Sequence, residues 1–175
     1  MNHRWPVALA AALLATGCTS SGGDDPDPAT AEDALLAQRD AVEETAQGLV
    51  AASEDVLGSR VLESRGGWEG CTSRFPEGYE DFRYTADVRL AARPGSPEDV
   101  GAELATVAER SGYDVAPASE DVEVTDGPVS ATLQDVPDLG AEGDVLIRLA
   151  AGPCVDVPED EWRDWMSRDD PGPQV

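Results

Sequence analysis

The sequence predicts an α+β fold: an antiparallel sheet of four to five strands, with two long helices packed on one face and a short C-terminal helix. Three observations lead to this prediction. A long helical pattern opens the folded part, a strictly alternating strand pattern follows, and further short strand patterns come after a second helical one. Residues 30–168 contain no internal repeat and no break in composition, so we expect a single domain there.

The first helix is expected from Thr30 to about Val56. Large apolar residues recur every seven positions along it, at Leu35, Val42, Leu49 and Val56, with alanines beside them. Thr30 and Asp33 resemble a capping box. This narrow stripe should lie closely against a sheet, although the heptad spacing also permits a coiled coil through self-association.

The second helix is expected to begin at Ser96-Pro97-Glu98-Asp99 and to end at Gly112. A serine N-cap, a proline in the first helical position and acids in the first turn are typical of a helix start. Glycine is the usual residue after a helix end.

The clearest strand is residues 82–90, where Phe82, Tyr84, Ala86, Val88 and Leu90 alternate with Arg83, Thr85, Asp87 and Arg89. This alternation is typical of a strand with one face in water. Shorter strands are expected at 59–63, 122–124, 129–133 and 145–149, with another beginning near 113–116 and a hairpin at Asp126-Gly127. The glycines after the first of these should bend the chain and bring Trp68 onto the core.

Composition excludes several kinds of chemistry. The single histidine, His3, lies in the apolar leader described below, and the chain contains no lysine. The mature chain therefore has no imidazole for zinc or for nucleophile activation, and no amine for a Schiff base. We predict no cofactor and no metal.

The chain is strongly acidic. Its formal charge of −24 becomes −25 without residues 1–17, because these carry Arg4 and no acid. Such a surface repels nucleic acid, so a nucleic-acid partner is not expected. The acidity favours a role in solubility, with a site for a cationic partner as the alternative.

The N-terminus is typical of a secretory signal. Arg4 precedes an apolar run of nine residues, Val7–Ala15, which is too short to span a bilayer. The end of this run and the three residues after it, Leu13-Leu14-Ala15-Thr16-Gly17-Cys18, resemble the lipobox of bacterial lipoproteins, although Ala15 stands where that family prefers leucine. The resemblance implies a signal peptide over 1–17, lipidation of Cys18, and a location on the extracytoplasmic face of the cell membrane. Release of a soluble protein by cleavage at a nearby small residue is the alternative.

Residues 18–29 read as a flexible acidic tether, since they contain no large apolar side chain. This tether, the alanine-rich helix, the glycine-rich segment around Trp68 and the late Pro153-Cys154 are together similar to small envelope lipoproteins of high-GC Gram-positive, actinobacterial cells. That resemblance implies a location and supplies no catalytic motif.

If Cys18 carries lipid, Cys71 and Cys154 remain as a pair in an oxidising compartment, and we expect a disulfide between them. The chain-entropy model gives such a bridge roughly 4 to 5 kcal/mol of stabilisation. A redox site is the alternative, but neither cysteine lies in a Cys-x-x-Cys motif.

Two sets of residues are candidates for a binding surface. Trp162, Trp165 and Met166 follow helical spacing in a short C-terminal helix, and could form either an exposed aromatic face or part of the core. Arg83, Arg89 and Arg148 could lie near one another on the wet side of the sheet, with ordinary surface ion pairs as the alternative. Residues 169–175 are expected to be a disordered tail.

The sequence favours a non-catalytic binding or accessory module of the cell envelope, anchored to the membrane by lipid. An envelope protein or a small apolar ligand is the expected partner. Two alternatives stay open: a carrier with an apolar cavity between helices and sheet, and a carboxylate-only hydrolase of wall polymers, for which Glu69, Glu77, Glu80 and Asp81 are candidates.

Overall fold

The computed structural model describes residues 28–74, 78–91, 100–113, 115, 121–136, 144–170 and 172–175. The expected signal peptide, Cys18 and residues up to 27 lie outside these ranges. The elements in chain order are α1 (Pro28–Leu57), β1 (Arg60–Gly70), β2 (Ser73–Arg74), β3 (Gly78–Tyr79), β4 (Asp81–Ala91), α2 (Val100–Arg110), β5 (Val122–Asp126), β6 (Val129–Asp135), β7 (Val145–Ala151), β8 (Val155–Asp156), the 3₁₀ helix η3 (Glu159–Glu161) and α3 (Trp162–Ser167).

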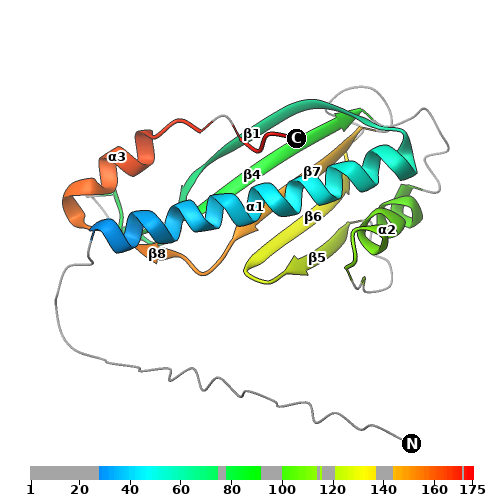
Figure 1. The fold of residues 1–175 in the computed structure, drawn as a ribbon. Helices are drawn as coiled ribbons and strands as arrows, with labels where there is room; N and C mark the ends of the chain where they lie inside the picture. Colours follow the sequence, from blue (N-terminus) through cyan, green and yellow to red (C-terminus); the bar gives the residue numbers. More distant parts are fainter. Residues whose placement is uncertain are drawn as a thin grey trace, which may run out of the picture.

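The main sheet is antiparallel and confirms the α+β prediction. Its strands are ordered β1-β4-β7-β6-β5, and the short β8 also pairs with β4. Figure 1 shows α1 running across one face of the sheet, with α2 beside it over the β5 and β6 side. β5 and β6 form the expected hairpin, in which Asp126 pairs with Val129 and Gly127 has a φ of 53°.

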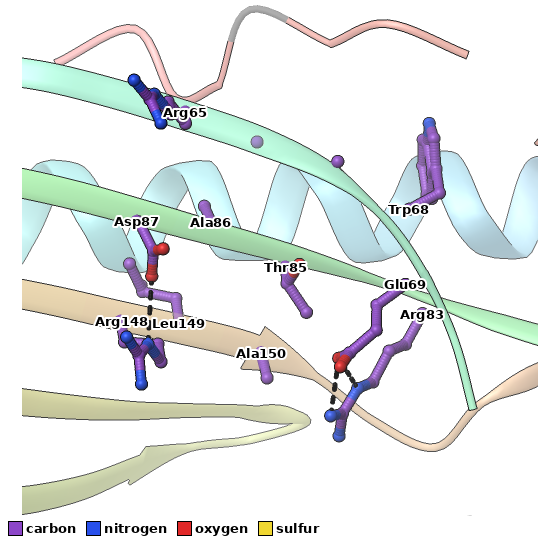
Figure 2. A pocket seen from close by; sticks show the side chains of 12 residues that line it. Arg65, Trp68, Glu69, Arg83, Thr85, Ala86, Asp87, Arg148, Leu149 and Ala150 are labelled. Carbon is purple, nitrogen blue, oxygen red and sulfur yellow. Dashed lines mark hydrogen bonds and ion pairs between the residues drawn. The ribbon is translucent and has the colours of Figure 1, made fainter. Parts of the chain in front are cut away.

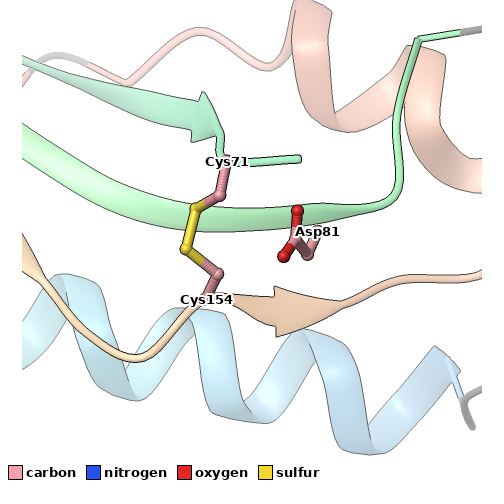
Figure 3. A group of neighbouring side chains, drawn as sticks. All are labelled: Cys71, Asp81 and Cys154. Carbon is pink, nitrogen blue, oxygen red and sulfur yellow. A yellow bond between two sulfur atoms is a disulfide. The ribbon is translucent and has the colours of Figure 1, made fainter. Parts of the chain in front are cut away.

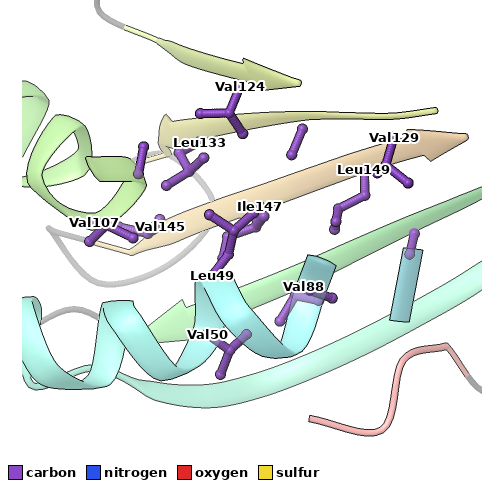
Figure 4. Packing of buried hydrophobic residues seen from close by; sticks show 14 of the residues in the cluster. Leu49, Val50, Val88, Val107, Val124, Val129, Leu133, Val145, Ile147 and Leu149 are labelled. Atoms are coloured by element: carbon purple, nitrogen blue, oxygen red, sulfur yellow. The ribbon is translucent and has the colours of Figure 1, made fainter. Parts of the chain in front are cut away.

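The core lies between the helices and the sheet. Leu35, Val42 and Leu49 of α1 are completely buried, as their seven-residue spacing predicts. Figure 4 shows Leu49 and Val50 of α1 facing Val88 of β4 and Ile147 of β7, with Val107 of α2 beside Val145. Alanines along α1 allow the close approach of helix to sheet that this packing requires.

α2 covers the remaining part of the same face. Leu104, Val107 and Ala108 are fully buried, and Gly112 ends the helix with a φ of 90°. The backbone N–H of Tyr113 donates to the carbonyl of Ala108 at 3.0 Å, which closes the last turn. The expected start at 96–99 lies outside the described residues, as do residues 114 and 116 of the strand expected at 113–116. Tyr113 and Val115 are not in a strand.

β1 is longer than the sequence predicts. It runs through Gly66, Gly67 and Gly70 as one strand of 11 residues, where a bend was expected after residue 63. The only irregularity in its pairing with β4 is a register shift between Val61 and Glu63. The prediction of a bend was wrong, because both adjacent glycines stay in the strand and pair with β4, Gly66 with Ala86 and Gly67 with Thr85.

Within 169–175, where a disordered tail is expected from the sequence, residues that the structure describes contact β1. Asp170 forms a β-bridge with Gly66, and the Ser64 hydroxyl donates to the carbonyl of Pro173 at 2.9 Å. Pro173 is buried, and Figure 1 shows the C-terminus beside β1. Polar and backbone contacts hold this segment, and the side chain of Val175 is 40% exposed. No apolar pattern in the sequence therefore predicts where the segment lies.

Candidate functional site

The predicted disulfide between Cys71 and Cys154 is confirmed, with Cα atoms 6.5 Å apart. Figure 3 shows that it joins the end of β1 to the segment before β8, beside Asp81. An Asp81 oxygen and the two sulfur atoms lie within 4.8 Å of one another. Both sulfurs are bonded to each other, so neither is a thiolate that could hold a metal. Asp81 instead accepts hydrogen bonds from the backbone N–H of Thr72 at 2.6 Å and from its hydroxyl at 3.1 Å.

The tryptophans of the C-terminal helix do not form a binding surface. Trp162 and Trp165 are 5% and 2% exposed, and they pack in a second hydrophobic cluster with Ala31, Leu35, Phe82 and Val157. The indole N–H of Trp162 donates to the carbonyl of Val157 at 3.1 Å. Met166 alone of the three candidates is exposed, at 50%. The helical spacing was correct, but the aromatic face is turned to the interior.

Trp68 links the two clusters, as expected for an interior residue. Its ring meets Tyr84 and Trp165 edge-on, with ring centroids 4.9 Å away in each case. The Tyr84 hydroxyl donates to Asp170 at 2.7 Å, which fastens the C-terminal segment to the sheet. Burial, and after it this hydrogen bond, raise the pKa of Tyr84 above its ordinary value of 10.0.

The opposite face of the sheet carries polar side chains, and no helix among the described residues packs on it. On β4 the alternation predicted from the sequence holds, because Phe82, Tyr84, Ala86, Val88 and Leu90 are buried on the helix side. The register of β1 and β7 with β4 then places Arg65, Gly67 and Glu69, with Arg148 and Ala150, on the same face as Arg83, Thr85 and Asp87. We call these eight residues the open face.

A depression of about 520 Å³ lies on the open face and is exposed to solvent. Two ion pairs border it, and Figure 2 shows Thr85 and Ala150 between them. Arg83 donates from Nε and Nη2 to one oxygen of Glu69 at 2.9 and 2.7 Å. The volume of the depression is in the usual range for small-ligand sites, roughly 300 to 1,000 Å³.

The second ion pair joins neighbouring strands. Arg148 of β7 donates from Nε to Asp87 of β4 at 3.2 Å. The side chains are 59% and 50% exposed, so this pair contributes little to stability. Both charged groups are therefore accessible from solvent at the border of the depression.

Arg89 lies apart from this site. Its Nε donates to Asp144 at 3.1 Å, and the Asp144 side chain is 5% exposed. Its partner across the sheet in β7 is Leu146, two residues from Arg148. The predicted cluster of three arginines is therefore divided: Arg83 and Arg148 border the depression, and Arg89 forms a separate, partly buried ion pair.

Sequence reasoning missed Arg65 and Gly67 as parts of the site. Both lie on the part of β1 that was expected to bend. The signal was present in weak form, since Arg65, Gly67 and Glu69 follow a period of two and alternate with Gly66, Trp68 and Gly70. The strand partner of each residue depends on the register with β4, which the sequence pattern does not supply.

Among the described residues, no helix combines the length and apolarity needed to cross a membrane. Of the four acids considered for a hydrolase, Glu77 lies outside the described residues, Glu69 is paired with Arg83, and Asp81 is hydrogen-bonded to Thr72. The fourth, Glu80, forms backbone hydrogen bonds with Thr72 and Val157. We compared the chain with protein-family models, with curated proteins and with solved structures, and none of the three comparisons found a match.

Proposed function

We propose that this chain is a lipid-anchored, extracytoplasmic binding or accessory module of the cell envelope, and that it binds its partner on the open face. The observation that carries the proposal is the depression bordered by Arg83–Glu69 and Arg148–Asp87. It lies on a sheet face that no described helix covers. A concave site with a few convergent polar groups is the usual form of a ligand site.

Two features support the location. The resemblance of residues 13–18 to a lipobox makes Cys18 the attachment point. The disulfide between Cys71 and Cys154 is of a kind that persists in oxidising compartments. The tether between Cys18 and α1 would let the domain approach partners away from the membrane surface.

The arrangement of the carboxylates supports a non-catalytic role. Hydrolysis of a glycosidic bond requires two acids facing each other about 5 to 10 Å apart. Glu69 lies opposite Arg83, and Asp87 is four residues further along β4, about 13 Å of strand. Each of the two carboxylates is directed to a guanidinium group rather than to the other acid.

The anchor is tested by labelling cells that produce the chain with an alkyne fatty acid. We expect the wild-type protein to carry the label and to sediment with membranes. Cys18→Ser should lose the label and appear in the medium. Label on the Cys18→Ser variant, or none on the wild type, would contradict lipidation at this residue.

The open face is tested by co-sedimentation of residues 19–175 with isolated envelope fractions. Both hydrophobic clusters and the disulfide lie between Ala31 and Trp165, so residues 19–175 retain all three. Gly67→Phe would place a ring in the depression, because Gly67 lines it and a Cβ added there meets nothing within 4 Å. Gly48→Phe is the matched control. Gly48 is exposed on α1, away from the open face, and a Cβ added there also meets nothing within 4 Å.

We expect retention of the wild type and of Gly48→Phe on the envelope fractions, and loss of Gly67→Phe. Equal retention of all three proteins would place the binding surface elsewhere and refute the proposed role of the open face.

A further inference from the structure

A row of small uncharged residues crosses the whole sheet on the open side. The register aligns Gly67 of β1, Thr85 of β4, Ala150 of β7, Ser130 of β6 and Thr125 of β5. We call these five residues the small-residue row. It runs perpendicular to the strands over four strand spacings, about 19 Å.

Charged residues border this row. Two residues further along the strands, Arg65, Asp87 and Arg148 lie side by side on one border, and Glu69 and Arg83 lie on the other. The two borders are four residues apart along β1, about 13 Å. The depression follows the part of the row on β1, β4 and β7. On β1 and β4 the site is thus an uncharged strip between two charged borders.

Gly67 is not explained by the packing of the chain itself. Added Cβ atoms at Gly66 and Gly70 would collide with Tyr84 and Tyr79, whereas one at Gly67 would meet nothing within 4 Å. Glycine within a strand lowers stability and often marks a place where a ligand approaches the backbone. Because Gly67 has no side chain, the depression is open down to the backbone of β1 at this position.

The site offers donors and acceptors close together. Among the described residues, the terminal nitrogens of Arg148 have no hydrogen-bond partner, and neither does the Thr85 hydroxyl. Arg83 directs two nitrogens to a single oxygen of Glu69, which leaves the other carboxylate oxygen for a ligand. Such a surface suits hydroxyl groups, because each hydroxyl both donates and accepts.

The charges around the depression favour a neutral ligand over a strongly ionic polymer. The depression is lined by three arginines, Arg65, Arg83 and Arg148, and two acids, Glu69 and Asp87, so its formal charge is +1 on a chain of −24. A polyanion would be repelled by the rest of the surface, and a polycation would meet the guanidinium groups.

An extended peptide fits the site less well than a polyol. The backbone N–H and C=O groups of a sheet lie in its plane and bond to neighbouring strands, so peptides normally add at a sheet edge. A peptide crossing the face would leave most of its amide groups without protein partners, whereas hydroxyls can bond to side chains singly.

We propose that the depression on the open face binds a neutral glycan chain laid across β1, β4 and β7. This inference rests on the proposed function of the open face and specifies its ligand. The glycan lies on Gly67, Thr85 and Ala150, and its hydroxyls bond to Arg83, Arg148 and their carboxylate partners.

The test is a titration of ¹⁵N-labelled residues 19–175 with linear hexasaccharides of β-1,4-linked glucose and of β-1,4-linked N-acetylglucosamine. Hexagalacturonate and a neutral hexapeptide serve as anionic and peptide comparisons. We expect at least one neutral hexasaccharide to shift amide resonances of Gly67, Thr85 and Ala150. Gly67→Phe should weaken this binding by about tenfold or more, while Gly48→Phe leaves it within about twofold.

Thr85→Val gives a second, nearly isosteric variant, which should weaken binding severalfold by removing one floor hydroxyl. Stronger binding of the hexapeptide or hexagalacturonate, or no shift with either neutral chain, would overturn the glycan assignment. If envelope co-sedimentation still depends on Gly67 in that case, the ligand class is wrong and the open face remains the binding surface. If co-sedimentation is also unaffected by Gly67→Phe, the proposed function fails with it.

Discussion

Replacing Gly66 with alanine should destabilise the protein, although alanine is normally the better residue in a strand. The added Cβ would collide with the Tyr84 hydroxyl and lie 2.8 Å from the Cα of Gly172. Neither neighbour can yield easily: Tyr84 is 1% exposed, and its hydroxyl is bonded to Asp170. The C-terminal segment would therefore have to move away from β1.

The magnitude follows from three contributions. Overpacking a filled site costs about 1 to 3 kcal/mol. Loss of the Tyr84–Asp170 hydrogen bond adds about 0.5 to 1.5 kcal/mol. The reduced backbone freedom of alanine in the unfolded chain offsets about 0.4 to 1 kcal/mol. Combined, they give an expected net loss of about 0.5 to 4 kcal/mol in the free energy of unfolding.

Gly67→Ala is the matched control in the neighbouring position of the same strand. Its Cβ points to the open face and meets nothing within 4 Å, so only the backbone effect remains, a gain of about 0.4 to 1 kcal/mol. Urea unfolding followed by tryptophan fluorescence measures both variants against the wild type. If both substitutions change stability equally, or if Gly66→Ala is neutral, the packing of the C-terminal segment on β1 is refuted.

Three further predictions concern the interior. Trp165→Ala should lower the free energy of unfolding by about 3 to 5 kcal/mol, because it removes a buried ring that packs on Trp68; a loss below about 1 kcal/mol in urea unfolding would show that the second cluster is not packed as described. Replacing Cys71 and Cys154 together with serine should cost about 4 to 5 kcal/mol on the chain-entropy model for a separation of 83 residues. Thermal unfolding of this double variant beside the wild type checks that figure, and an unchanged midpoint would be inconsistent with a structural bridge. Stability should also fall as the pH rises above 10.0, because the pKa of Tyr84 is raised in the folded state, so the unfolded chain releases its proton first. The expected slope from this group is about 1.4 kcal/mol per pH unit, and urea unfolding between pH 9 and 11 should give a shallower slope for Tyr84→Phe; identical slopes would contradict the burial of this hydroxyl.

The elements with strong periodicity could be predicted from the sequence. The seven-residue spacing in α1 identified Leu35, Val42 and Leu49 as core, and the alternation in β4 separated Arg83 from its buried neighbours. In these segments one face is apolar throughout, so the pattern itself specifies which side packs.

The parts that could not be predicted depend on contacts between distant segments. Gly66 remains in a strand because Gly172 packs against it, 106 residues later in the chain (172 minus 66). Asp170 is held by Tyr84 through a polar contact, which no apolar pattern reveals. The candidate site also depends on contacts between distant segments, because the register of β1 with β4 places Glu69 opposite Arg83.

The most direct test of the open face as the binding surface is an amide-exchange comparison by hydrogen–deuterium labelling. Residues 19–175 would be labelled alone and in the presence of solubilised envelope extract. We predict added protection in β1, β4 and β7 around Gly67, Thr85 and Ala150, and no such gain in the Gly67→Phe variant. Protection confined to the outer surface of α1, or to the region of Met166, would contradict this account.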